Sequence, residues 1–189
     1  MNTCSTVQGP WYATPDEIAE LSENLKRAHL SLLSALEGFP SADWERVGTD
    51  GGWSAGQIVE HIFLAQRVLC EQVHSHLHDQ VRPGLPAMME QQRTRLFRYL
   101  PDGGKAEAGK RSTAFEGLTQ GGVAGEISAA EEQFSDLLGT AAASPIKAIG
   151  WNSPFFGELS ALLWLHYPAL HTTRHVAQLS RLRASLEDR

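Results

Sequence analysis

The sequence has few cysteines, no excess of positive charge and no long apolar run, and each shortage excludes a class of protein. Its two cysteines, Cys4 and Cys70, are too few for a disulfide framework and form no CxxC pair, so we expect a reduced, cytoplasmic chain. The formal net charge of -6 argues against general nucleic-acid binding, which needs a basic face. No apolar stretch approaches the roughly 18 residues of a membrane span, and no signal peptide is expected.

What the sequence does contain is helical periodicity. Its 189 residues have the size of a single domain, over residues 1–189, with 1–13 as an N-terminal tail. Apolar residues recur at three- and four-residue steps in long segments, and no stretch alternates with period two for long enough to predict a sheet. The predicted helices span 15–37, 55–80, 123–142 and 154–186, with Thr14, Ser54 and Ser153 as N-caps of the first, second and fourth. The fold class is therefore all-α, a four-helix bundle.

The connection between the second and third predicted helices is unusually long. Residues 81–121 contain Pro83, Pro86 and Pro101 together with several glycines, and one short helix is expected near residues 88–99. A connection of this length inside a compact domain is usually functional or partly disordered. We expect an elaborated, irregular loop whose excess of basic residues either meets an anionic substrate or is simply solvated.

Histidines provide the candidate metal ligands. His171 and His175 lie four residues apart in HTTRH, so one face of the last helix carries both imidazoles, and His61 comes from the second helix. Three histidines would leave a coordination position open, as in catalytic metal sites. A histidine on a helix is more often packed or exposed than a ligand, so spacing alone leaves the metal undecided. His166 projects to the far side of its helix, and His76 lies about 22 Å along from His61, which excludes both.

Polar residues near these ligands are candidates for a supporting role. On helical wheels Gln57 shares the face of His61, Gln178 shares that of His171, and Arg174 lies beside it. The glutamines could orient an imidazole or a bound ligand, or they could be satisfied polar groups at the mouth of the bundle. Arg174 could reach an anion or remain in solvent.

Pro168 lies three residues before His171, inside the last predicted helix. Proline removes a backbone donor and clashes with the preceding turn, so we expect a kink or a fresh helix start at this position.

Two segments carry a resemblance to a known family. WSAGQIVEHIFLAQ, around His61, and SPFFGELSALLWLHYPALHTTRHVAQLSRLR, around His171 and His175, resemble the DinB/YfiT-like superfamily of metal-dependent enzymes. The resemblance implies a four-helix bundle, often paired as a homodimer, that binds a divalent metal, zinc or nickel, through these three histidines. Some members of that family are thiol-dependent S-transferases that use low-molecular-weight thiols, and others carry a hydrolase label.

The residues allow two reactions on a small-molecule substrate. A metal with three neutral histidines can bind a thiol as thiolate, or it can lower the pKa of a water molecule. HTTRH lacks the glutamate that HExxH hydrolases use as general base, and Glu60 points about 100° away from His61. Thiol transfer is therefore favoured over hydrolysis. A non-catalytic metal-binding or dimerising module is the remaining alternative.

Overall fold

The computed structural model describes residues 9–48, 51–102 and 110–187. Within these ranges the chain is mostly helical, with long helices α1 (Pro15–Leu36), α2 (Ala55–His76), α3 (Leu85–Asp102), α4 (Val123–Ala142) and α5 (Ala161–Glu187). Strands β1 (Gly150–Ser153) and β2 (Gly157–Ser160) form one small antiparallel pair. The prediction of an all-α four-helix bundle is confirmed, and the hairpin is a minor addition.

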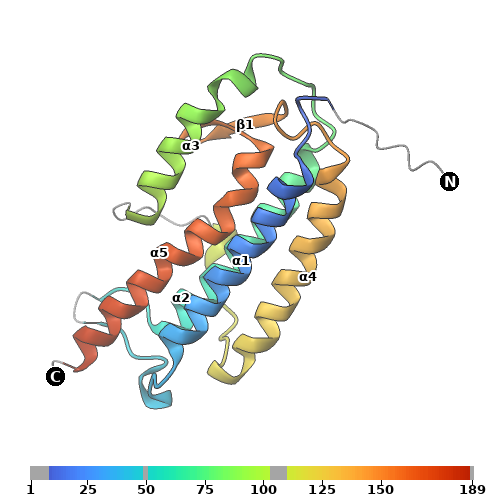
Figure 1. Cartoon of the computed structure of the whole chain (residues 1–189). Coiled ribbons are helices and arrows are strands. Elements are labelled where there is room, and N and C mark those ends of the chain that lie inside the picture. The colour runs from blue at the N-terminus through green and yellow to red at the C-terminus, as the bar shows by residue number, and fades with distance from the viewer. Residues whose placement is uncertain (1–8, 49–50, 103–109, 188–189) are drawn as a thin grey trace.

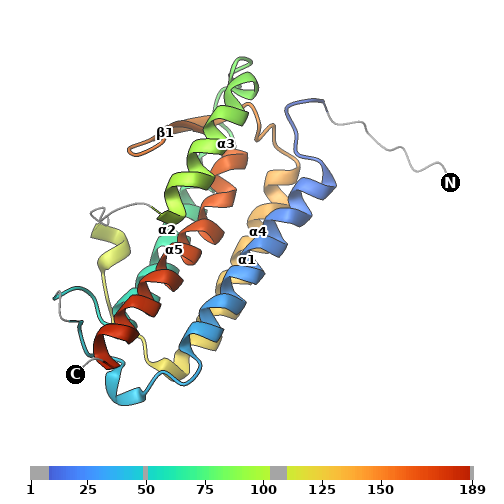
Figure 2. The same cartoon turned by 60° about the vertical axis from the view of Figure 1, so that its left-hand side comes forward.

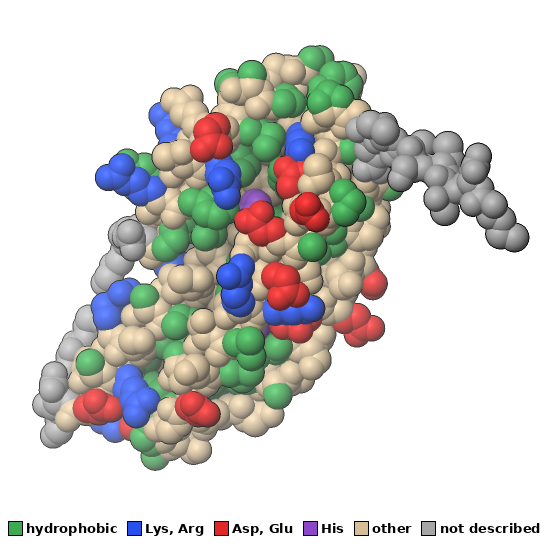
Figure 3. All heavy atoms as spheres, viewed as in Figure 1, with side chains coloured by type: hydrophobic (Ala, Val, Ile, Leu, Met, Phe, Trp, Pro, Cys, Tyr) green, Lys and Arg blue, Asp and Glu red, His purple; other side chains and the backbone are tan. Residues whose placement is uncertain are grey.

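Four of the helices close into a bundle. Helix α1 packs against α4 and α5, and α2 packs against the same two helices, so the order around the bundle is α1, α4, α2, α5. Helix α3 lies outside this ring, along one end of α5 (Figures 1 and 2). The face formed by α1 and α5 carries acidic, basic and hydrophobic side chains intermixed (Figure 3). None of the described helices is long and apolar enough to cross a membrane.

The first two helices begin as their sequences predict. Thr14 and Glu17 form a reciprocal capping box at the start of α1, with Pro15 in its first turn. Ser54 and Gln57 form the same arrangement at the start of α2. Each box satisfies two backbone N–H groups that the helix cannot pair internally, and losing such a cap typically costs about 1 kcal/mol.

The segment after α2 is more regular than predicted. Helix α2 ends at His76 rather than near residue 80, and α3 covers Leu85–Asp102 rather than a short stretch around 88–99. Pro86 falls in the first turn of α3, where its missing N–H costs nothing. The side chains of Leu85, Leu96 and Leu100 are buried, and this burial stabilises α3 against its neighbours.

The prediction that the last helix starts at residue 154, capped by Ser153, is wrong. Residues 150–160 form the β1–β2 hairpin, in which Ser153 pairs with Gly157. The hydroxyl of Ser153 accepts hydrogen bonds from the backbone of Phe155 and Phe156 within the turn. Gly157 has a φ of +74°, which favours glycine, and α5 begins at Ala161 instead. Strands of four residues are too short to show a period in the sequence.

Helix α5 does not restart at Pro168. It runs as one helix from Ala161 to Glu187 with Pro168 inside it. Pro168 is itself buried, and the residues on both sides pack into the bundle. Tertiary packing therefore maintains the helix across a position where local propensity alone would end it.

Candidate metal centre

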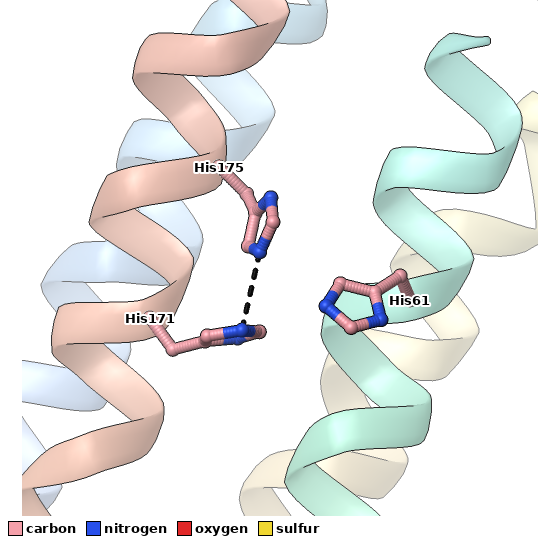
Figure 4. Close-up of side chains that lie close together, drawn as sticks. All are labelled: His61, His171 and His175. Carbon is pink, nitrogen blue, oxygen red and sulfur yellow. Dashed lines mark hydrogen bonds between the residues drawn. The ribbon is translucent and has the colours of Figure 1, made fainter. Parts of the chain in front are cut away.

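The three predicted ligands lie together in the bundle interior. His61 comes from α2, and His171 and His175 come from successive turns of α5, with all three rings directed into the space between the helices (Figure 4). Their exposed fractions are 5%, 8% and 6%. One ring nitrogen from each lies within 4.8 Å of the other two. We call this group the histidine trio.

The trio has the donor chemistry that a divalent metal requires, and two of its nitrogens have the spacing. Imidazole nitrogens bind zinc at about 2.0–2.1 Å, which places two of them about 3.3 Å apart around a tetrahedral ion. The Nε2 atoms of His171 and His175 are 3.1 Å apart. Imidazole also suits nickel, so these residues could hold either ion.

Burial keeps the trio neutral, as metal ligation requires. Desolvation lowers the pKa of His61, against a hydrogen bond that raises it. Desolvation and the neighbouring imidazoles lower the pKa of His171 well below its ordinary value. Desolvation and the neighbouring His61 lower the pKa of His175 to about 4, against a hydrogen bond to Gln178 that raises it. Each ring therefore has a lone pair available at neutral pH.

Hydrogen bonds to the outer nitrogens orient two of the rings. The Nδ1–H of His61 donates to the carbonyl oxygen of Ser112 at 2.7 Å. The Nδ1–H of His175 donates to Oε1 of Gln178 at 2.8 Å. Both bonds leave Nε2 as the unprotonated nitrogen of its ring. Such outer partners hold the tautomer and the direction of a metal-binding histidine.

The other two predicted supporting residues have different partners. Oε1 of Gln57 accepts the backbone N–H of Ser54 at 3.1 Å, so this side chain completes the start of α2. An Nη1–H of Arg174 donates to the carbonyl oxygen of Leu100 at 3.4 Å. The charge of Arg174 also contributes to the lowered pKa of His171 and His175. Arg174 therefore lies close to the trio.

Glu60 is a supporting residue that sequence reasoning assigned no role. Its buried carboxylate accepts the backbone N–H groups of three consecutive residues, Glu116, Gly117 and Leu118. The carbonyl oxygen of Leu118 in turn accepts the indole N–H of Trp44 at 2.8 Å. These bonds hold the segment that follows Ser112 against α2. The adjacency of Glu60 to His61 was visible in the sequence, but the role of the Ser112 carbonyl had no sequence signal.

Aromatic rings cover the trio on two sides. Trp53 packs on His61 with ring centroids 4.7 Å apart, and Phe115 meets the edge of Trp53 at 5.5 Å. Tyr167 stacks on His171 at 5.5 Å. These rings lower the local dielectric around the imidazoles, which strengthens electrostatic interactions there.

A hollow of ≈180 Å³ adjoins the trio. Its lining includes Trp53 and Gln178, each of which contacts a histidine of the trio, and Arg181. Arg181 is exposed, and its charge contributes to the lowered pKa of His175. A small molecule in this hollow would contact residues that surround the trio, such as Trp53 and Gln178.

The histidines that the wheel excluded do lie elsewhere. His76 stacks on Trp151 at 4.3 Å and its Nδ1 lies 2.6 Å from a carboxylate oxygen of Asp79. His166 meets the edge of Phe97 at 5.1 Å, on the side of α5 that faces α1 and α3. Neither belongs to the group of converging histidines in the described part of the chain.

Comparisons with known proteins agree with this fold. A solved structure, YfiT from Bacillus subtilis, described as a probable metal-dependent hydrolase with an unusual four-helix bundle topology, is similar to the chain with a TM-score of 0.57 and 14% identity. The match covers 95% of this chain and 93% of YfiT. No curated protein matches the sequence significantly. The family model of the DinB superfamily matches residues 24–179, a span that includes every member of the trio, and the chain therefore belongs to the DinB superfamily.

Proposed function

We propose that the protein is an enzyme that binds one divalent metal ion, zinc or nickel, through His61, His171 and His175. In this proposal it uses the metal to activate a low-molecular-weight thiol for transfer to a small-molecule substrate. The observation that carries the proposal is the convergence of three buried, neutral imidazoles on one point. A bound metal would lower the pKa of a thiol or a water molecule at its open position.

Residues around the trio would orient its rings, limit the access of water and set the local charge. Ser112 and Gln178 fix which nitrogen of His61 and of His175 faces the centre. Trp53 and Tyr167 limit the access of water to the rings. Arg174 and Arg181 add positive charge near the trio, which favours a substrate or thiol with an anionic group.

One observation favours thiol activation over hydrolysis, and a second indicates where the thiol would come from. The carboxylate adjacent to the trio in sequence, Glu60, is held by three backbone N–H groups, and this use removes it as a general base. Burial raises the pKa of Cys70 to about 11, so this thiol stays protonated and a reactive thiolate would come from a second molecule.

Hydrolysis is the second candidate function. The observation that favours it is the similarity to YfiT, whose description is that of a probable metal-dependent hydrolase. A bundle that binds metal without turnover is the third. For each candidate we propose a cytoplasmic homodimer as the working form, in keeping with the family resemblance.

Rates with and without thiol distinguish these candidates. Zinc- or nickel-loaded protein would be incubated with 1-chloro-2,4-dinitrobenzene and bacillithiol, mycothiol or glutathione. In the expected reaction a carbon–sulfur bond forms, chloride leaves, and the thiol proton passes to solvent. Metal-dependent turnover that requires a thiol supports the transferase. Ester or amide cleavage without thiol supports the hydrolase, and stoichiometric metal with neither activity supports the binding module.

A further inference from the structure

A second cavity lies away from the histidine trio, between α1, α3 and α5. Its volume is ≈280 Å³. Both α1 and α5 contribute residues at three- and four-residue steps, so one face of each helix forms a wall. Ala28 and Ala169 are the smallest side chains of these walls, and their size leaves space where α1 and α5 would otherwise interlock.

His166 provides an unused polar group in this cavity. Its side chain lines the cavity and is 7% exposed. No residue in the described part of the chain hydrogen-bonds to either of its ring nitrogens, and these nitrogens are not among the enclosed unpaired atoms, so they open onto the cavity. A mostly buried imidazole whose nitrogens open onto a cavity offers a hydrogen-bonding group to a ligand atom there. Burial lowers the pKa of His166 to about 4, which leaves the ring neutral with one N–H donor.

The charge of the cavity favours an anion. Arg27 is the one charged residue of its lining. Its guanidinium donates to Oδ1 of Asn24 at 2.6 Å and to the carbonyl oxygen of Glu23 at 3.4 Å, and it retains further donors. Around His166, Glu20 and Arg93 shift its pKa in opposite directions, and Glu17 is paired with Lys147 at 2.7 Å. These charged groups lie outside the lining, where the one charge is that of Arg27.

The rest of the lining is suited to a small apolar body. Phe97 presents its ring beside the imidazole of His166, and Leu170 adds an aliphatic surface. Figure 3 shows the face formed by α1 and α5, where a histidine is visible between charged side chains of both signs.

We propose that this cavity binds a compact organic carboxylate, with its anionic group at Arg27 and Asn24, its apolar body against Phe97 and Leu170, and one polar atom at His166. The site is distinct from the histidine trio, and its existence does not depend on the proposed metal chemistry. Benzoate has the required anionic group and planar apolar body, so it is the probe for this site.

The test is a titration of benzoate into the zinc-loaded full chain, followed by the imidazole resonances of His166 in nitrogen-edited NMR spectra. Saturable shifts of these resonances, with affinity for benzamide at least about tenfold weaker, support an anion site, because a hydrogen bond to a charged group is roughly twice as strong as a neutral one. Equal affinity for benzamide would overturn the assignment of an anion. No saturation by either compound would overturn the site itself.

Three variants locate the binding. Arg27→Gln should weaken benzoate about tenfold, whereas Lys26→Gln, which removes an exposed charge one residue away and outside the lining, should not. His175→Ala disables the metal site and should leave benzoate affinity unchanged. If His175→Ala abolishes the shifts, the ligand acts at the trio and the second site does not exist. If Arg27→Gln and Lys26→Gln weaken benzoate binding equally, the effect comes from the net charge of the protein and the proposed placement of the anionic group is wrong.

Discussion

The Nδ1 atom of His61 lies 2.7 Å from the carbonyl oxygen of Ser112, a residue 51 positions later in the chain. This hydrogen bond joins the candidate metal centre on α2 to the connection between α3 and α4. The same connection is tied to α2 a second time, by Glu60 and the backbone N–H groups of residues 116–118. The orientation of one ligand therefore depends on the docking of a distant segment.

Glu60→Gln should weaken metal binding although Glu60 does not contact the metal position. The amide loses the charge that stabilises three backbone N–H groups, so the segment carrying Ser112 should loosen and His61 should lose its outer partner. Loss of such a partner typically reduces metal affinity by about 10–100-fold. Zinc competition with a chromophoric chelator measures the change. Glu132→Gln, at an exposed position of α4, is the control, and equal affinities for both variants would contradict the proposed link.

His175→Ala should remove stoichiometric metal. The variant retains two imidazoles and an open space, which is too few ligands for a tight zinc or nickel site. The metal content of the purified protein, measured by elemental analysis, should fall from about one ion per chain to near zero. His76→Ala should retain full metal content, because His76 lies against Trp151 and Asp79. Full metal in the His175 variant would refute the assignment of the trio.

The two glutamines chosen from the helical wheels should behave differently. Gln178→Ala removes the acceptor for Nδ1 of His175 and should lower metal affinity about tenfold or more. Gln57→Ala removes half of the capping box of α2 and should instead reduce the free energy of unfolding by about 1 kcal/mol, with metal affinity unchanged. Isothermal titration with zinc and urea unfolding measure the two quantities. If Gln57→Ala lowered metal affinity and Gln178→Ala did not, then Gln57, not Gln178, would be the residue that orients a ligand.

His166 should make the fold less stable in mild acid. Its pKa falls from 6.5 to about 4 on folding because of burial, so between these values the unfolded chain binds the proton and the folded chain does not. The free energy of unfolding therefore decreases as pH falls below about 6.5, and the decrease is complete only near pH 4. From pH 7 to pH 5 the contribution of His166 is about 2 kcal/mol. Urea unfolding of wild type and His166→Phe at both pH values isolates it, and parallel pH dependence would show that His166 does not contribute.

Much of this arrangement could be predicted from local patterns. The capping boxes at Thr14 and Ser54 depend on residues three positions apart, and the shared face of His171 and His175 depends on the helical repeat. The exclusion of His166 and His76 follows from the same geometry. Such features involve only residues that are close along the chain, so they can be predicted from the sequence alone.

Other features depend on contacts between distant segments. The hairpin at residues 150–160 was missed because strands of four residues carry too little periodic signal, and α5 continues through Pro168 because packing outweighs local propensity. Gln57 and Gln178 look equivalent on helical wheels, yet one closes a helix end and the other bonds to His175.

By itself the sequence determined which side chains share a helical face, because a regular helix repeats its geometry every few residues. Only the tertiary structure decided which backbone groups meet those side chains. Every residue carries the same peptide carbonyl, so nothing in the amino-acid letters distinguishes Ser112 as the partner of His61 until the chain has folded back upon α2.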